Sequence, residues 1–151
     1  MKLSEIMSRE LEVIQPDDSL QYAAKRMRDR DIGFLPVCDG EVLLGVISDR
    51  DITIRALADG MDVNIMLARD LMTTPAISCF DDQDVREAAK IMEENQIRRL
   101  VVLSRDDNRL VGVVSLGDLA RNGTANFSGK VLRKVSEPET AEESSEPAKK
   151  M

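Results

Sequence analysis

The sequence predicts an α/β (α+β) fold of two tandem repeats, each a small three-stranded sheet with helices. The first observation is an internal repeat, because "VIQPDD" from Val13 returns as "ISCFDD" from Ile77, and "GVISDRD" from Gly45 returns as "GVVSLGD" from Gly112. The second is that, in both copies, a segment with the apolar period of a helix is followed by two β-rich runs. Neither copy is long enough to bury much by itself, so the two are expected to pack together through their sheets.

The first copy is expected to contain a strand, a helix, two paired strands and a second helix. The strand lies near 12–15, and apolar residues at i, i+3, i+4 and i+7 predict a helix over 19–30. The aspartates of "PDD" before this helix can cap it. The strand runs "FLPV" and "VLLGVIS" follow, and Asp39 and Gly40 between them indicate a tight turn. The second helix starts near Asp49.

The second copy repeats this order. A strand is expected near 76–79, a helix over 84–95, strands at "RLVVL" and "LVGVVS", and a last helix from about Gly117. The expected domains are therefore residues 1–62 and 63–125. Residues 126–151 are expected to be a flexible, disordered tail, because "SEPETAEESSEPAKKM" lacks any apolar period. Such a tail serves either as a solubilising segment or as a peptide that binds a partner.

The composition argues against several classes of function. The net charge of −7 and an aromatic content of 3% disfavour nucleic acid as a partner, because phosphate binding relies on Lys and Arg and base stacking relies on aromatic rings. The chain contains no His, and Cys38 and Cys79 stand far apart in apolar runs. A metal site and a catalytic nucleophile therefore both lack their usual residues, and no enzymatic activity is expected.

The distribution of apolar residues also bears on location. No apolar run reaches the ~18 residues of a membrane-spanning helix. The start, "MKLSEIMSRE", has no apolar stretch of the signal-peptide type. A cytoplasmic protein with reduced, buried cysteines and no membrane association is therefore expected.

Each copy places a serine at the end of a strand and an aspartate three residues later, at the start of a helix. These residues are Ser48 and Asp51 in the first copy and Ser115 and Asp118 in the second. A helix start offers unpaired N–H groups that suit phosphate, and a carboxylate there can accept hydrogen bonds from ribose hydroxyls. The same pattern suits a simple helix cap. Both interpretations stay open, because duplication copies caps as readily as binding residues.

Two adjacent arginines, Arg98 and Arg99, stand where the first copy has Gly33 and Phe34. Because side chains alternate along a strand, one arginine is expected to point into the cleft between the sheets. It would need an anion there, either a carboxylate of this acidic chain or a phosphate. Arg50, within "SDRD", is a third candidate for phosphate.

Together these motifs resemble a tandem pair of cystathionine-β-synthase (CBS) domains, also called a Bateman module, over residues 3 to about 122. The resemblance rests on "VIQPDDSLQYAAKRM", "IGFLPV" and "GVISDRD", and on "ISCFDDQDVREAAKIM", "IRRLVV" and "GVVSLGD". It implies a pseudo-two-fold pair of facing sheets with two clefts between them. Many such pairs bind an adenosyl ligand there: AMP, ADP, ATP, NAD(H) or S-adenosylmethionine. No cofactor is required, and Mg²⁺ would enter only with ATP.

The resemblance also implies roles for particular residues. Asp51 and Asp118 would hold ribose, and Ser48 and Ser115 would lie near phosphates. Arg98 and Arg99 match positions that often reach phosphates. The residues matching the strand that often lines the adenine pocket are Val13, Ile14, Ala76 and Ile77. Unequal sites are expected, because the first copy lacks arginines of its own at this joint, and which cleft the arginines serve stays open.

The favoured hypothesis is a stand-alone regulatory sensor that binds an adenosyl ligand between the repeats. Its regulated partner would be another protein, which the sequence does not name. CBS pairs commonly form homodimers through their helices, although the Ala-Ala pairs at 23–24 and 88–89 suit internal packing equally well. The alternative is a structural protein-interaction module with empty clefts, in which the serines and aspartates are caps and the arginines pair with internal carboxylates.

Overall fold

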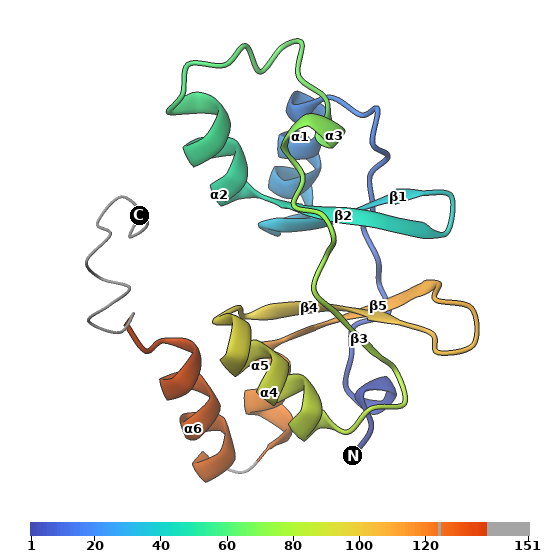
Figure 1. The fold of residues 1–151 in the computed structure, drawn as a ribbon, viewed down its shortest axis with the longest axis vertical. Coiled ribbons are helices and arrows are strands. Elements are labelled where there is room, and N and C mark those ends of the chain that lie inside the picture. The colour runs from blue at the N-terminus through green and yellow to red at the C-terminus, as the bar shows by residue number, and fades with distance from the viewer. Residues whose placement is uncertain (124, 139–151) are drawn as a thin grey trace.

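The chain forms two α/β units whose sheets face each other (Figure 1). The structure is a computed structural model that describes residues 1–123 and 125–138. The first unit contains α1 (Leu20–Arg30), β1 (Phe34–Asp39), β2 (Val42–Ser48) and α2 (Asp49–Asp51), which continues as the π-helical segment η2 (Ile52–Leu57). The second contains β3 (Ser78–Phe80), α4 (Val85–Asn95), β4 (Arg99–Leu103), β5 (Leu110–Ser115) and α5 (Leu116–Asn122). The remaining helices are η1 (Leu3–Glu5), α3 (Ala68–Leu71) and α6 (Ala125–Val135). The predicted fold class and the two repeats are confirmed.

The long helix of each unit follows the predicted range, but its cap differs from the expectation. Ser19 caps α1 by accepting a hydrogen bond from the Tyr22 N–H, and Asp84 caps α4 by accepting one from the Arg86 N–H. The aspartates of "PDD" and "FDD" precede these caps. Each helix buries the apolar face that its periodicity indicated, with Ala23 and Met27 in α1.

The two sheets differ by one strand. In both units the last two strands pair antiparallel, and β3 adds a parallel strand to the second sheet. The third strand expected near 12–15 in the first unit is not formed, and only Ile14 bridges to Val37. The strand pairing, with Ile14 opposite Val37 and Cys79 opposite Val102, shifts the sequence alignment by one residue and places Pro16 where the second unit has Asp81. This proline is the reason. Asp81 N donates to Leu103 O at 3.0 Å, whereas a proline has no N–H to extend the ladder.

The units exchange short segments, so they do not coincide with the consecutive halves 1–62 and 63–125. Leu3 and Met7 are buried in the core of the second unit, while Ala68 and Leu71 are buried in the core of the first. Backbone hydrogen bonds fix both crossings, from Ser8 N to Val113 O at 2.9 Å and from Val46 N to Thr73 O at 3.0 Å. Figure 1 shows the two connecting segments running in opposite directions between the units.

A third apolar cluster joins the units between the sheets. Cys38, Val101 and Leu110 are its buried members. Partly buried side chains from both units, including Phe34, Val46 and Ala76, pack around them. The expected contact through the sheets is therefore present, and the clefts described below lie at its edges.

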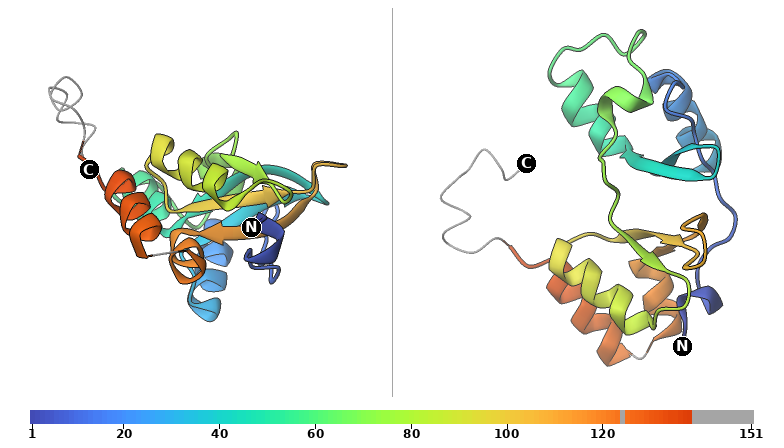
Figure 2. Two further views of the ribbon diagram at one scale, coloured as in Figure 1. Left: turned by 90° about the horizontal axis from the view of Figure 1, so that it is seen from below. Right: turned by 45° about the vertical axis from the view of Figure 1, so that its right-hand side comes forward.

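The start of the expected disordered tail is a helix instead. In α6, Val131 is 1% exposed and Val135 is 6% exposed, and Phe127 packs against the same core. These three residues recur every fourth position, a helical period that the polar composition around them obscured. Figure 2 shows α6 lying along α4, which it contacts together with α5. The expectation of disorder for 126–151 was thus wrong for 126–135, and its part from 139 onward lies outside the described residues.

Candidate functional site

Both Ser-x-x-Asp motifs form reciprocal helix caps. In the first unit, Ser48 Oγ accepts from Asp51 N at 3.1 Å and Asp51 Oδ2 accepts from Ser48 N at 2.9 Å. In the second, the Ser115 and Asp118 distances are 3.0 and 2.8 Å. The cap interpretation is therefore confirmed in both copies.

The caps use only one oxygen of each carboxylate. Asp51 Oδ1 lies 4.0 Å from Arg55 Nη1, and Asp118 Oδ1 forms an ion pair with Arg121. The Asp51 side chain is 21% exposed and that of Asp118 is 16% exposed. A carboxylate oxygen has room for more than one hydrogen bond, so capping leaves each aspartate able to accept a ligand hydroxyl.

A first cleft combines residues of both units. Ser48 and Asp51 line it from the first unit. Arg98, just before β4, and Arg99, the first residue of β4, line it from the second. Arg50 is a third arginine of its lining, and Asp49 is a second carboxylate beside Asp51. Its volume is about 460 Å³, within the range of small-molecule sites, and its apolar walls come from Phe34, Val46, Ile77 and Ile97. The arginines thus join the Ser-x-x-Asp motif of the other repeat, which the sequence had left open.

A second cleft, of about 280 Å³, holds Ser115 and Asp118. Arg99 reaches this cleft too, but the other charged residues that line it are Glu10, Glu12, Asp31 and Asp118. Glu12 is partly neutralised, since it forms ion pairs with Arg26 and, at 3.3 Å, with Arg30. The two clefts therefore differ in charge, with arginines prominent in the first and carboxylates in the second.

The four residues expected to line the adenine pocket do not line one common site. Ile77 lines the first cleft and is 40% exposed. Ile14 is 1% exposed and packs in the first core, so its side chain is not available to a ligand. Ala76 packs in the cluster between the sheets, and Val13, although 42% exposed, lines neither cleft.

Sequence reasoning missed a matched pair of cleft residues, Gln96 and Asp31. Each follows the long helix of its unit in a left-handed conformation, with φ of 51° and 54°. Gln96 lines the first cleft and Asp31 lines the second. The repeat aligns them at one position, so self-alignment would have found this difference of an amide against a carboxylate.

The two cysteines are free, buried thiols. Burial raises the pKa of Cys79 to about 12 and also raises that of Cys38. Among the described residues, no three His, Cys, Asp or Glu side chains gather in a way that could hold a metal ion. Over residues 1–123 and 125–138, every helix falls short of the length and apolar character needed to cross a membrane.

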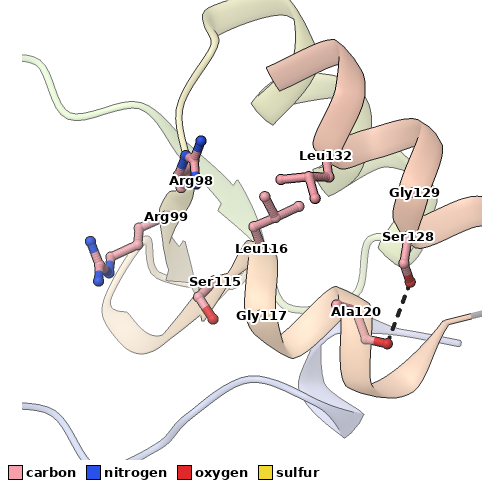
Figure 3. Close-up of a pocket in the computed structure, with 9 residues that line it drawn as sticks. All are labelled: Arg98, Arg99, Ser115, Leu116, Gly117, Ala120, Ser128, Gly129 and Leu132. Carbon is pink, nitrogen blue, oxygen red and sulfur yellow. Dashed lines mark hydrogen bonds between the residues drawn. The ribbon is translucent and has the colours of Figure 1, made fainter. Parts of the chain in front are cut away.

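A groove between α5 and α6 lies beside the first cleft (Figure 3). It has a volume of about 520 Å³, and Leu116 and Leu132 face each other across it. Arg98 and Arg99 stand at its edge, so both arginines are shared between the groove and the first cleft.

The fold and the clefts define a duplicated protein with ligand-sized sites between its repeats. The model of the CBS domain family matches residues 3–57 and 68–123, so the chain belongs to the CBS-domain proteins. The CBS domain-containing protein YhcV of Bacillus subtilis (strain 168) is 35% identical over 135 residues, which cover 89% of this chain and 94% of that protein. Hypoxic response protein 1 of Mycobacterium tuberculosis is 38% identical over 119 residues, covering 78% of this chain and 82% of that protein.

Solved structures share the fold. A crystal structure of Hypoxic Response Protein I with two coordinated zinc ions matches at a TM-score of 0.74 and 36% identity. The match covers 82% of this chain and 100% of that chain. CBSX2 in complex with AMP matches at 0.69 and 26% identity, covering 80% and 94%. The CBS domain pair of protein MJ0100, in complex with 5'-methylthioadenosine and S-adenosyl-L-methionine, matches at 0.72 and 29% identity, covering 86% and 98%.

Proposed function

We propose that this chain is a stand-alone regulatory module that binds a phosphorylated adenosyl ligand, such as AMP, ADP, ATP or NAD(H), in the first cleft. The observation that carries the proposal is the meeting of Ser48 and Asp51 from one repeat with Arg98 and Arg99 from the other. A helix start, a carboxylate and guanidinium groups around one cavity suit a ribose phosphate. AMP in CBSX2 and the two adenosyl compounds in the MJ0100 pair support this ligand class.

In the proposed arrangement each part of the ligand has its own partners. Asp51 Oδ1 accepts hydrogen bonds from the ribose hydroxyls while Oδ2 keeps the cap. Arg98 and Arg99 bind the phosphate, and Ile77 packs against adenine. The module performs no reaction, and any effect on a partner follows from the shape change on binding.

The second cleft is proposed to bind phosphorylated ligands more weakly. Glu10 and Asp31 line it together with Asp118, and their charges repel a phosphate. We therefore expect each chain to bind one nucleotide when the ligand concentration is near the dissociation constant of the first cleft.

Calorimetric titration with AMP, ADP, ATP, NAD, NADH and S-adenosylmethionine tests the proposal. Wild-type protein should bind at least one phosphorylated compound. Arg98→Ala and Arg99→Ala should each weaken that binding about tenfold or more, since a hydrogen bond to a charged group contributes about 1.5–3 kcal/mol. Arg109→Ala is the matched control, because Arg109 precedes β5 at the end opposite to the clefts. The absence of any binding, or equal affinities in all three variants, would refute the proposal.

The variant Asp51→Asn separates ribose binding from capping. Its amide oxygen can still accept from Ser48 N, so the melting temperature should change little. Affinity for the adenosyl ligand should fall, because a neutral amide accepts ribose hydrogen bonds less strongly than a carboxylate. An unchanged affinity would show that Asp51 does not bind the ribose.

The alternative function is a structural protein-interaction module whose clefts stay empty. The completed caps favour it, because the Ser and Asp of each motif satisfy each other without a ligand. A titration panel without binding would support this alternative. A homodimer through the helices and a separate regulated protein remain predictions under both functions, as do the absence of nucleic-acid and membrane partners.

A further inference from the structure

The chain just after α6 contacts two residues that line the first cleft. Arg98 Nη2 donates to Ser136 Oγ at 3.1 Å, and Gln96 Nε2 donates to the carbonyl oxygen of Glu137 at 2.8 Å. Gln96 and Arg98 both line the cleft. The family match ends at residue 123, so these contacts come from a segment outside the repeated domains.

The position of Ser136 is set by the packing of α6. Val131 and Val135 are buried in the core of the second unit, and Ser136 N donates to Leu132 O at 3.1 Å as a continuation of the helix. The backbone of Ser136 is therefore held in place, with its hydroxyl within hydrogen-bond distance of Arg98.

This contact restrains Arg98 without blocking it. A guanidinium carries five N–H donors, so one bond to Ser136 leaves the others for a phosphate. Without this bond Arg98 is free to turn over the groove between α5 and α6, at whose edge it stands in Figure 3. A long side chain loses rotamer freedom when it binds, and restraining it beforehand reduces that loss.

We propose that Ser136 is a positioning residue that holds Arg98 for the phosphate of the ligand, so that the end of α6 is a functional part of the first cleft. The Glu137 carbonyl acts on Gln96 in the same way. This inference rests on the proposed function, and it adds a third structural element to a site otherwise made by the two repeats.

Titration of Ser136→Ala with AMP and with adenosine tests the inference. AMP binding should weaken by about three- to tenfold, while adenosine binding should stay the same, because adenosine has no phosphate for Arg98 to bind. Ser136→Thr keeps a hydroxyl and should restore most of the affinity.

Ser128→Ala is the matched control on the same helix. Ser128 Oγ donates to Ala120 O at 3.4 Å, away from the cleft, so its loss perturbs the contact between α5 and α6 without touching Arg98. Its AMP affinity should equal that of the wild type. As a second readout, AMP should slow hydrogen exchange at Ser136 more than at Ser128.

Each remaining outcome overturns the inference in a distinguishable way. Unchanged AMP affinity in Ser136→Ala, with AMP still bound by the wild type, would refute the role of Ser136 alone. Equal losses for AMP and adenosine, or equal losses in both serine variants, would indicate a general effect on folding. Failure of the wild type to bind any adenosyl compound would refute the proposed function and this inference together.

Discussion

Replacing Gly45 by Ala tests the close contact between β2 and the segment that crosses between the units beside the first cleft. A Cβ at this position would lie 2.5 Å from the Thr73 carbonyl oxygen and 3.2 Å from Met72 Sδ. Thr73 cannot retreat freely, because Val46 N donates to Thr73 O at 3.0 Å and Thr73 N donates to Val46 O at 2.8 Å. The strand must therefore separate from the crossing segment, and Thr73 itself lines the cleft.

The size of the effect follows from two opposing contributions. Overpacking costs about 1–3 kcal/mol. Alanine recovers about 0.4–1 kcal/mol by restricting the unfolded chain. We therefore expect Gly45→Ala to lower the free energy of unfolding by about 1–2 kcal/mol, which lowers the melting temperature by roughly 2–4 °C for each kcal/mol.

Thermal and urea unfolding of Gly45→Ala and Gly129→Ala measure this effect against its control. Gly129 lies within α6, where an added Cβ meets nothing within 4 Å. The same substitution should there raise the free energy of unfolding by about 0.5–1 kcal/mol, because glycine is a poor helix former. A Gly45→Ala protein as stable as the wild type would refute the close approach of Thr73, and a destabilised Gly129→Ala protein would refute the open space at α6.

Three further predictions concern the caps and the ionisable groups. Ser48→Ala and Ser115→Ala should each lower the free energy of unfolding in urea by about 1 kcal/mol, and a change of only a few tenths would contradict the caps. Burial raises the pKa of the Cys79 thiol to about 12, so iodoacetamide at pH 8 should label it only after unfolding; mass spectrometry showing rapid labelling of the folded protein would contradict its burial. The pKa of Asp84 is lowered by the hydrogen bond from the Arg86 N–H and by the terminal amine, so the folded carboxylate binds a proton less readily than the unfolded one. Its stabilisation is present above the unfolded pKa of about 4 and is lost as the pH falls, so Asp84→Asn should flatten the acid limb of the stability curve, and an unchanged limb would contradict the assignment.

The role of the first glycine in "GVISDRD" and in "GVVSLGD" could not be predicted from the sequence. The repeat showed that Gly45 and Gly112 are equivalent, but no local pattern explained them. In the structure, a Cβ at Gly112 would lie 2.6 Å from Met7 Sδ and 3.0 Å from Ser8 O, just as one at Gly45 would meet Thr73. Both glycines make room for the segment that crosses between the units. Such a contact joins residues distant in sequence, so periodicity cannot reveal it.

The sequence by itself determined the local elements, because their causes are local. Apolar periodicity placed α1 and α4, alternation and turn residues placed the hairpins, and the Ser-x-x-Asp spacing placed the caps. Only the tertiary structure decided that Arg98 lines the first cleft while Arg99 lines both, that Ile14 is a core residue, and that the chain after α6 contacts Arg98. Those outcomes depend on how two similar units pack and exchange segments. Burial and charge pairing between residues far apart in the chain decide that packing, and duplication left both arrangements of the arginines equally compatible with the sequence.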